Sequence, residues 1–289
     1  MFFCTLFIVI FVIMKLLNGI EIPDMGFGTY LMAPEDTYGS VSCALRSGWR
    51  HVDTAAFYRN EAEVGAAVRD SGIPRADIFV TTKLWNTDRG YDSALRAFDR
   101  SSALLGLEYV DLYLIHWPAS PFFHDDWRQL NLDSWRALER LYREGRVRAI
   151  GLSNFMPRHI RPILAEAEVA PMVDQIEFHP GWVQRDCLDF CHERGIAVEA
   201  WAPLIKGAAL SHPVITGIAA AHGSSPAQVI LAWVRACGVI PLCKSVTHSR
   251  IAENLAAADL ALTPDEVEAI SALGYCGGRC YNPDNCDFR

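Results

Sequence analysis

Four residues with side chains suited to acid–base chemistry stand at or just after the carboxyl ends of short apolar runs. They are Asp53, Tyr58, Lys83 and His116. When a hydride reduces a carbonyl group, negative charge develops on the oxygen, so the site needs a proton donor and dipoles directed at that oxygen. A carboxylate, a phenol, an ammonium group and an imidazole together meet this need.

Tyr58 is the proton donor in this interpretation. A nearby ammonium favours tyrosinate, so we expect Lys83 to lower the pKa of the phenol from its free value of about 10. Asp53 pairs with Lys83, because an unpaired ammonium in a dry pocket is costly. His116 orients and polarises the carbonyl oxygen. Taken singly, each residue also has an ordinary structural explanation: a loop aromatic, the two halves of a buried ion pair, and a hydrogen-bonded rim histidine.

Apolar strand candidates alternate with helical segments along the whole chain, which predicts a parallel sheet with crossover helices. Eight strand candidates fall near residues 24–29, 50–54, 78–83, 110–116, 147–152, 172–178, 197–202 and 239–243. Helices are predicted over, for example, residues 60–71, 92–105, 132–144 and 226–237. Eight such units close a ring, so we predict an α/β fold of the (β/α)8 barrel type, in which chemistry takes place at the carboxyl ends of the strands. Asp111 and Asp174, near the starts of their strands, are expected to be structural.

An open doubly wound sheet gives a similar alternation of strands and helices. Its dinucleotide-binding form carries G-x-G-x-x-G after the first strand. The nearest segment here, residues 26–31, lacks the third glycine and is not followed at once by a long helix. This argues against that fold but leaves nucleotide binding open.

The first fourteen residues are apolar almost without a break. They are too few for the ~20 residues of a membrane-spanning helix, and they lack the basic start and cleavage site of a signal peptide. From Met14 to Pro23 the chain predicts a hairpin that turns at Asn18-Gly19 and closes the lower face of the barrel. We expect residues 14–289 to form one domain and residues 1–13 to be an extension, either a start-site artefact or an anchor.

The 289 residues carry a formal net charge of -8 and no run of five like charges. This argues against nucleic acid and anionic membrane as general partners, unless residues 1–13 are a membrane anchor. The nine cysteines do not follow a disulfide framework, which indicates reduced thiols in a cytoplasmic protein. Cys276, Cys280 and Cys286 lack a Cys-x-x-Cys pair, so we expect no metal there. We expect a monomer.

Motifs in a fixed order resemble the aldo-keto reductase family from about Leu16 to Phe288. They are Gly26-Phe27-Gly28-Thr29, Asp53-Thr54-Ala55 with Tyr58-x-Asn60-Glu61, Thr82-Lys83-Leu84-Trp85, Ile115-His116-Trp117-Pro118, Gly151-Leu152-Ser153-Asn154-Phe155, Asp174-Gln175-Ile176-Glu177, Ala200-Trp201-Ala202-Pro203-Leu204 and Lys244-Ser245-Val246-Thr247. The short insert after His116 and the ending at 282–288 are similar to the short-tailed microbial branch of diketogluconate and prostaglandin F-type reductases.

The resemblance implies NADPH-dependent reduction of aldehydes and ketones, with the four roles given above. Four matching residue types at successive strand ends, each inside a family motif, favour catalysis over the separate structural explanations. NADPH needs an aromatic face for its nicotinamide and polar groups for the carboxamide. In the resemblance Trp201, where family members often carry Tyr, provides the face, and Ser153, Asn154 and Gln175 provide the polar groups.

The resemblance also implies a phosphate site after the last strand, where backbone N–H groups and the helix dipole favour anions. Lys244 and Arg250 would hold the 2′-phosphate of NADPH. Leu242-Cys243 stands before Lys244 where the family usually has Ile-Pro. The complete set of expected cofactor residues is Gly28, Thr29, Ser153, Asn154, Gln175, Trp201, Leu204, Lys244, Ser245, Val246, Arg250, Glu253 and Asn254.

Tyr30, Phe57, Trp85 and Trp117 border the catalytic strand ends, and we expect Tyr30, Trp85 and Trp117 to contact a small carbonyl substrate with apolar or flat shape. Two other classes of function stay open at this point. One is a cofactor-binding sensor, against which the four catalytic residue types argue. The other is a metal-dependent barrel hydrolase that uses His51, His116 and His179, although these histidines lack matching carboxylates and Lys83 would oppose a divalent cation.

Overall fold

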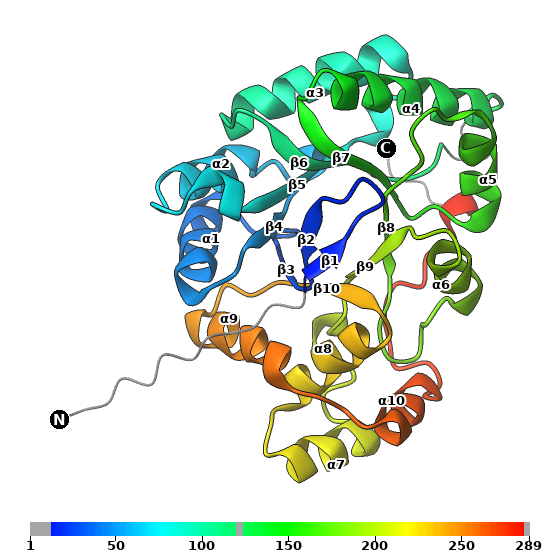
Figure 1. The fold of residues 1–289 in the computed structure, drawn as a ribbon. Coiled ribbons are helices and arrows are strands. Elements are labelled where there is room, and N and C mark those ends of the chain that lie inside the picture. Colours follow the sequence, from blue (N-terminus) through cyan, green and yellow to red (C-terminus); the bar gives the residue numbers. More distant parts are fainter. Residues whose placement is uncertain (1–12, 120–123, 286–289) are drawn as a thin grey trace.

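The structure is a computed structural model that describes residues 13–119 and 124–285. Eight parallel strands close into a barrel in the order β10-β3-β4-β5-β6-β7-β8-β9, with helices around the outside (Figure 1). The strands are β3 (Gly26–Gly28), β4 (His51–Asp53), β5 (Phe79–Leu84), β6 (Val110–Ile115), β7 (Val147–Ser153), β8 (Val173–Glu177), β9 (Ala197–Trp201) and β10 (Val239–Cys243). The predicted (β/α)8 barrel and all eight strand positions are confirmed.

The strands are buried on both faces, because helices cover the outside and side chains fill the inside. Every residue of β5 and of β6 is buried, for example. The interior is unusually polar at the carboxyl ends. Gln175 on β8 contacts Asp53 on β4, which are not neighbouring strands, so both side chains must point into the barrel.

Ten α-helices occur in the described residues. They are α1 (Pro34–Ser47), α2 (Glu61–Arg69), α3 (Tyr91–Leu105), α4 (Trp127–Arg143), α5 (Pro157–Glu166), α6 (Arg185–His192), α7 (Pro213–His222), α8 (Pro226–Ala236), α9 (His248–Leu255) and α10 (Pro264–Ser271). The four helices named from the sequence are present, but α4 begins before the expected start at Leu132. Its first turn is polar, and Asn131 is nevertheless buried because its side-chain oxygen accepts a hydrogen bond from the Ala119 N–H at 2.9 Å.

The predicted hairpin is present as β1 (Ile13–Lys15) and β2 (Glu21–Pro23), which pair antiparallel. Gly19 supplies the positive φ of its turn. The hairpin crosses the end of the barrel where the strands begin (Figure 1), and the Asn18 amide donates to the Arg148 carbonyl at the start of β7 at 3.0 Å. It therefore closes the lower face. The expected extension lies largely outside the described residues.

Asp111 lies at the lower end of the barrel. Its carboxylate pairs with Arg75 at 2.6 Å and Arg148 at 2.9 Å, and these contacts support the structural role predicted for it. Among the helices that the structure describes, none combines the length and apolarity needed to span a bilayer.

Candidate active site

Lys83 is the centre of the predicted catalytic group. Its side chain is fully buried, and its ammonium nitrogen lies 2.7 and 2.6 Å from the two carboxylate oxygens of Asp53 and 2.9 Å from the Thr54 carbonyl. The Tyr58 hydroxyl lies 3.3 Å from the same nitrogen. Three residues predicted from the sequence thus converge on one point at the carboxyl ends of β4 and β5.

The position of Tyr58 depends on a short turn after β4. Residues 56–58 form one turn of 3-10 helix, which ends at Arg59 with a left-handed φ of 57°. The buried side chain of Asn60 fixes this turn, because its oxygen accepts from the Thr54 hydroxyl at 2.8 Å and its nitrogen donates to the Thr29 carbonyl at 3.0 Å. The Tyr30 ring packs on the Tyr58 ring with centroids 4.9 Å apart.

The predicted direction of the Tyr58 pKa is wrong. Burial, the charge of Asp53 and the neighbouring Tyr30 raise the pKa of the phenol well above its ordinary value of 10.0. The reason is that Asp53 sits against Lys83 and cancels most of the field of the ammonium group, while desolvation penalises tyrosinate. Tyr58 is therefore a neutral phenol that keeps its proton near pH 7.

His116 follows β6 and faces the same mouth. Burial, then the charges of Lys83 and Arg89, hold the pKa of the imidazole well below its usual value, so the ring is neutral. Its centroid lies 5.6 Å from that of Tyr58 and 5.1 Å from that of Trp85, and both contacts are edge-on. A neutral imidazole can donate one hydrogen bond, and here it can donate to an oxygen atom that also accepts from the Tyr58 hydroxyl.

The residues expected to meet a nicotinamide lie together at the ends of β7, β8 and β9. The Trp201 indole N–H donates to the Asn154 side-chain oxygen at 2.8 Å, and the Asn154 amide donates to the His116 carbonyl at 2.9 Å and to the Ser153 hydroxyl at 3.0 Å. Asn154 adopts a left-handed φ of 64° that these contacts hold in place. The Gln175 amide lies beside Asp53 at 3.0 Å.

The residues expected to meet phosphate lie where β10 gives way to α9. Lys244 and Arg250 are exposed, and among the described residues no carboxylate pairs with either of them. The Ser245 hydroxyl accepts a hydrogen bond from the Thr247 N–H at 3.0 Å and shapes the turn before α9. Leu242 and Cys243 are buried in β10 and end the strand as expected, so the departure from Ile-Pro leaves the strand end in place.

The remaining expected cofactor residues lie at or after the carboxyl ends of β3, β9 and β10. Thr29 is buried and donates through its hydroxyl to the Asp53 carbonyl at 3.0 Å, which ties β3 to the catalytic strand. Gly28 is paired with Asp53 in the sheet. Val246 is exposed, Leu204 and Glu253 are partly buried, and Asn254 is buried.

A family model described as "Aldo/keto reductase family" matches residues 24–274. The chain belongs to the aldo-keto reductase family. It is 42% identical to the glyoxal reductase of Bacillus subtilis over 95% of this chain and 97% of that protein. It is 42% identical to the 9,11-endoperoxide prostaglandin H2 reductase of Trypanosoma cruzi over 93% of each chain. These relatives match the predicted microbial branch.

A solved structure of a variant of the protein Gox0644 in complex with NADPH is also similar, with a TM-score of 0.89 and 38% identity over 96% of this chain and all of that one. This aldo-keto reductase is thus an NAD(P)H-dependent oxidoreductase. The residues present fit a nicotinamide dinucleotide. Trp201 offers a flat face, Ser153, Asn154 and Gln175 offer polar groups beside it, and the two exposed cations stand at a helix start.

Aromatic side chains wall the mouth of this aldo-keto reductase. Trp85 stacks on Phe57 with centroids 3.9 Å apart, and Trp117 contacts Tyr281 edge-on at 5.9 Å. Tyr30 is 45% exposed and covers Tyr58 from outside. Tyr281 was not predicted from the sequence, which indicated only a loop for the tail. The path of that loop depends on distant contacts, such as the hydrogen bond from the Arg279 N–H to the Glu177 carboxylate at 2.6 Å.

Sequence reasoning also missed Glu199 as part of this site and treated His51 only as a possible metal ligand. Both are fully buried inside the barrel below Asp53 and Gln175. The Gln175 amide donates to Glu199 at 2.8 Å, and the His51 ring lies 3.0 Å from the Thr81 hydroxyl. The available signal was a glutamate in the middle of the apolar run Ala197–Trp201.

Among the described residues, one group of three possible metal ligands lies close together, namely Asp174, Cys187 and Cys191, all buried. Burial raises the pKa of Asp174 to about 8, and the neighbouring Cys191 together with burial raises the pKa of Cys187. Asp174 and Cys187 are therefore uncharged parts of the core near pH 7. The seven cysteines that the structure describes form no disulfide.

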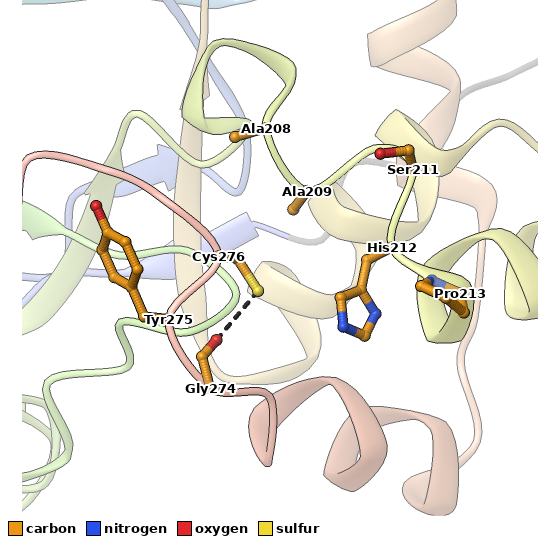
Figure 2. A pocket seen from close by; sticks show the side chains of 8 residues that line it. All are labelled: Ala208, Ala209, Ser211, His212, Pro213, Gly274, Tyr275 and Cys276. Atoms are coloured by element: carbon orange, nitrogen blue, oxygen red, sulfur yellow. Dashed lines mark hydrogen bonds between the residues drawn. The ribbon is translucent and has the colours of Figure 1, made fainter.

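A pocket of about 460 Å³ lies away from the catalytic residues, between the segment Ala208–Pro213 and the tail at Gly274–Cys276. Figure 2 shows the imidazole of His212 and the thiol of Cys276 facing this hollow. None of Asp53, Tyr58, Lys83 and His116 lines this pocket.

Proposed function

We propose that this protein reduces small aldehydes and ketones to alcohols with NADPH, and that Tyr58 is the general acid. The observation that carries this proposal is the cluster of Asp53, Tyr58 and Lys83 at 2.6–3.3 Å with the neutral imidazole of His116 beside it. NADPH, when bound, supplies the hydride to the carbonyl carbon.

The protein side of the reaction follows from the charges. Tyr58 stays protonated because its pKa is raised, so its hydroxyl donates a hydrogen bond to the carbonyl oxygen. As that oxygen becomes negative, it takes the phenolic proton, and the tyrosinate left behind is stabilised by the ammonium of Lys83 at 3.3 Å. Asp53 keeps Lys83 in place, and His116 donates to the same oxygen. Asp53, Lys83 and His116 are all buried, which limits the access of water that would compete for these hydrogen bonds.

Five residues hold the cofactor in this proposal. Trp201 covers one face of the nicotinamide, and Asn154 and Gln175 fix its carboxamide, so only the other face meets the substrate. Lys244 and Arg250 bind the 2′-phosphate, since a guanidinium grips a phosphate through two parallel hydrogen bonds. NADPH is therefore preferred over NADH.

The aromatic wall of Tyr30, Trp85 and Trp117 favours apolar or flat carbonyl compounds. The names of the relatives, a glyoxal reductase and a prostaglandin H2 reductase, agree with small and apolar substrates respectively. The alternative of a hydrolase that uses histidines loses support, because the one group of possible metal ligands among the described residues contains no histidine.

The test is to mix the protein with NADPH and a panel of short-chain and aromatic aldehydes, and to follow the absorbance of the reduced nicotinamide with and without a chelator. We expect turnover that chelation does not change. Binding of NADPH without turnover of any carbonyl would favour the sensor class, and turnover that needs added zinc would favour the metal-dependent class.

We further propose that residues 14–289 form one domain and act as a monomer in the cytoplasm. The hairpin joins the barrel through the hydrogen bond from the Asn18 amide to the Arg148 carbonyl at 3.0 Å, which supports one domain. The mass of the protein in solution tests the monomer, and a stable dimer would contradict it.

A further inference from the structure

We propose that Glu199 is a positioning residue of this active site, which clamps the amide nitrogen of Gln175 against Asp53 and so directs the amide oxygen of Gln175 toward the nicotinamide. The proposal rests on the proposed function, because it names a residue that acts through a cofactor contact. Glu199 touches neither the substrate nor the four catalytic side chains' reacting atoms.

The clamp consists of three side chains from three strands. The Gln175 Nε2 on β8 donates to Asp53 Oδ2 on β4 at 3.0 Å and to Glu199 Oε2 on β9 at 2.8 Å. All three residues are at most 3% exposed. Both hydrogens of the amide nitrogen are therefore used inside the barrel, one on each carboxyl group.

This arrangement settles which way the amide points. If the amide were turned over, its oxygen would face the ionised carboxylate of Asp53, which can only accept hydrogen bonds, and that contact would be repulsive. The amide oxygen of Gln175 accepts no hydrogen bond from any residue that the structure describes. It is the acceptor left for the amide N–H of a carboxamide at the mouth.

Glu199 differs from Asp53 because it has no cation of its own. The ammonium of Lys83 is taken by Asp53, and the His51 ring, 3.6 Å from Glu199, has its pKa lowered to about 3 by burial and is neutral. Burial and the charge of Asp53 raise the pKa of Glu199 to about 8. Near pH 7 Glu199 is thus a neutral carboxylic acid, and one carboxylate, not two, faces Lys83.

Gly26 leaves room for the His51 ring. A Cβ atom at Gly26 would meet a methyl group of Leu242 and would lie 2.9 Å from the His51 ring nitrogen, so a larger residue would collide with both. The groups that face Glu199 are then Gln175 from β8, His51 and Asp53 from β4, and Lys83 from β5. Above pH about 8, Glu199 ionises and adds an uncompensated negative charge below the Asp53–Lys83 pair.

The experiment compares wild type with Glu199→Gln and Glu199→Leu over a pH series from 6 to 10. It measures NADPH affinity by quenching of tryptophan fluorescence and turnover with one aldehyde of the panel. Glu139→Gln is the matched control, because Glu139 is also buried but accepts backbone N–H groups of residues 168 and 169 on the outer layer.

Glutamine at 199 copies the shape of the protonated acid and still accepts from Gln175. We expect Glu199→Gln to keep kcat and NADPH affinity within about threefold at pH 7 and to lose the fall of affinity that wild type and Glu139→Gln show above pH about 8. Leucine removes the acceptor, so Glu199→Leu should bind NADPH about tenfold more weakly, the equivalent of one hydrogen bond, with an unchanged KM for the aldehyde.

Two results would overturn the proposal: Glu199→Gln with the same alkaline fall as wild type, or a folded Glu199→Leu with wild-type NADPH affinity. If Glu199→Leu does not fold, the pH series of Glu199→Gln decides alone. If wild type binds NADPH but reduces no carbonyl, the proposed function fails, while the pH dependence of binding in wild type and Glu199→Gln still tests the clamp.

Discussion

Burial and the charge of Asp53 raise the pKa of the Tyr58 phenol, and the ammonium of Lys83 does not reverse this. The two buried charges lie 2.6 Å apart and largely cancel at the hydroxyl. An acid that keeps its proton in the resting state suits a donor, because the ammonium is needed only once negative charge has formed on Tyr58. The pair therefore matters more for stabilising the product of proton transfer than for weakening the O–H bond beforehand.

Removal of one charge of this pair tests how strongly the site depends on it. Asp53→Asn leaves the buried ammonium of Lys83 without its counter-charge, so we expect the free energy of unfolding to fall by about 3–5 kcal/mol. Urea denaturation measures this. The matched control is Glu144→Gln, which breaks the exposed pair with Arg140 and should change nothing measurable. If Asp53→Asn and Glu144→Gln lower the free energy of unfolding equally, the buried Asp53–Lys83 pair contributes no more to stability than an exposed pair.

At the scale of elements, we propose that the turn between β10 and α9 decides whether NADPH or NADH is preferred. Lys244→Ala and Arg250→Ala should each lower kcat/KM for NADPH by about 10- to 100-fold, since each removes a charged hydrogen bond to the 2′-phosphate. The kcat/KM for NADH should stay within about twofold, because NADH lacks that phosphate. Steady-state kinetics with both cofactors test this, and a parallel loss for NADH would place the two cations elsewhere on the cofactor.

The packing of α2 against α3 depends on one glycine. A Cβ at Gly65 would lie 1.9 Å from the Leu105 carbonyl oxygen, which is backbone and cannot step aside. Gly65→Ala should therefore lower the free energy of unfolding by about 1–3 kcal/mol or more. Gly39 in α1 has open space around it, so Gly39→Ala should raise stability by about 0.5–1 kcal/mol through helix propensity. Thermal unfolding of both variants measures these changes. Changes of the same sign in the free energy of unfolding would contradict the prediction.

The strand positions, and the gathering of Asp53, Tyr58, Lys83 and His116 at one end of the barrel, could be predicted from the sequence because both follow local patterns. An apolar run followed by a reactive side chain marks a strand end, as at Lys83 and His116. The start of α4 was not readable, since the burial of Asn131 depends on a hydrogen bond to Ala119 in another segment. The contact of Gln175 with Asp53 and Glu199 was hidden for the same reason, because it crosses the barrel and exists only once the sheet has closed.

At the scale of the whole molecule, buried acids link stability to pH. The pKa of Asp174 is raised by burial from 3.8 to about 8. Between these values the folded chain holds a proton that the unfolded chain has released, so this carboxyl group makes stability fall as pH rises. The pKa of His51 is lowered from 6.5 to about 3. Between these values the unfolded chain binds a proton that the folded chain does not, so this imidazole makes stability rise as pH rises.

The contribution of Asp174 can be isolated by difference. We expect the free energy of unfolding of wild type, minus that of Asp174→Asn, to decrease between pH 5 and pH 8 by up to about 1.4 kcal/mol per pH unit. Urea denaturation of both proteins across this range measures the difference. A difference that stays flat or grows with pH would mean that the folded chain does not hold this proton.

In the proposed reaction the phenolic proton of Tyr58 passes to the substrate. This step is tested by the single-turnover rate of aldehyde reduction by protein loaded with NADPH, measured for wild type and for Tyr58→Phe. Phenylalanine keeps the ring beside Tyr30 and removes only the hydroxyl, so we predict a rate lower by about 10²- to 10⁴-fold with NADPH affinity within about twofold. A Tyr58→Phe variant that reduces the aldehyde at the wild-type rate would contradict the account.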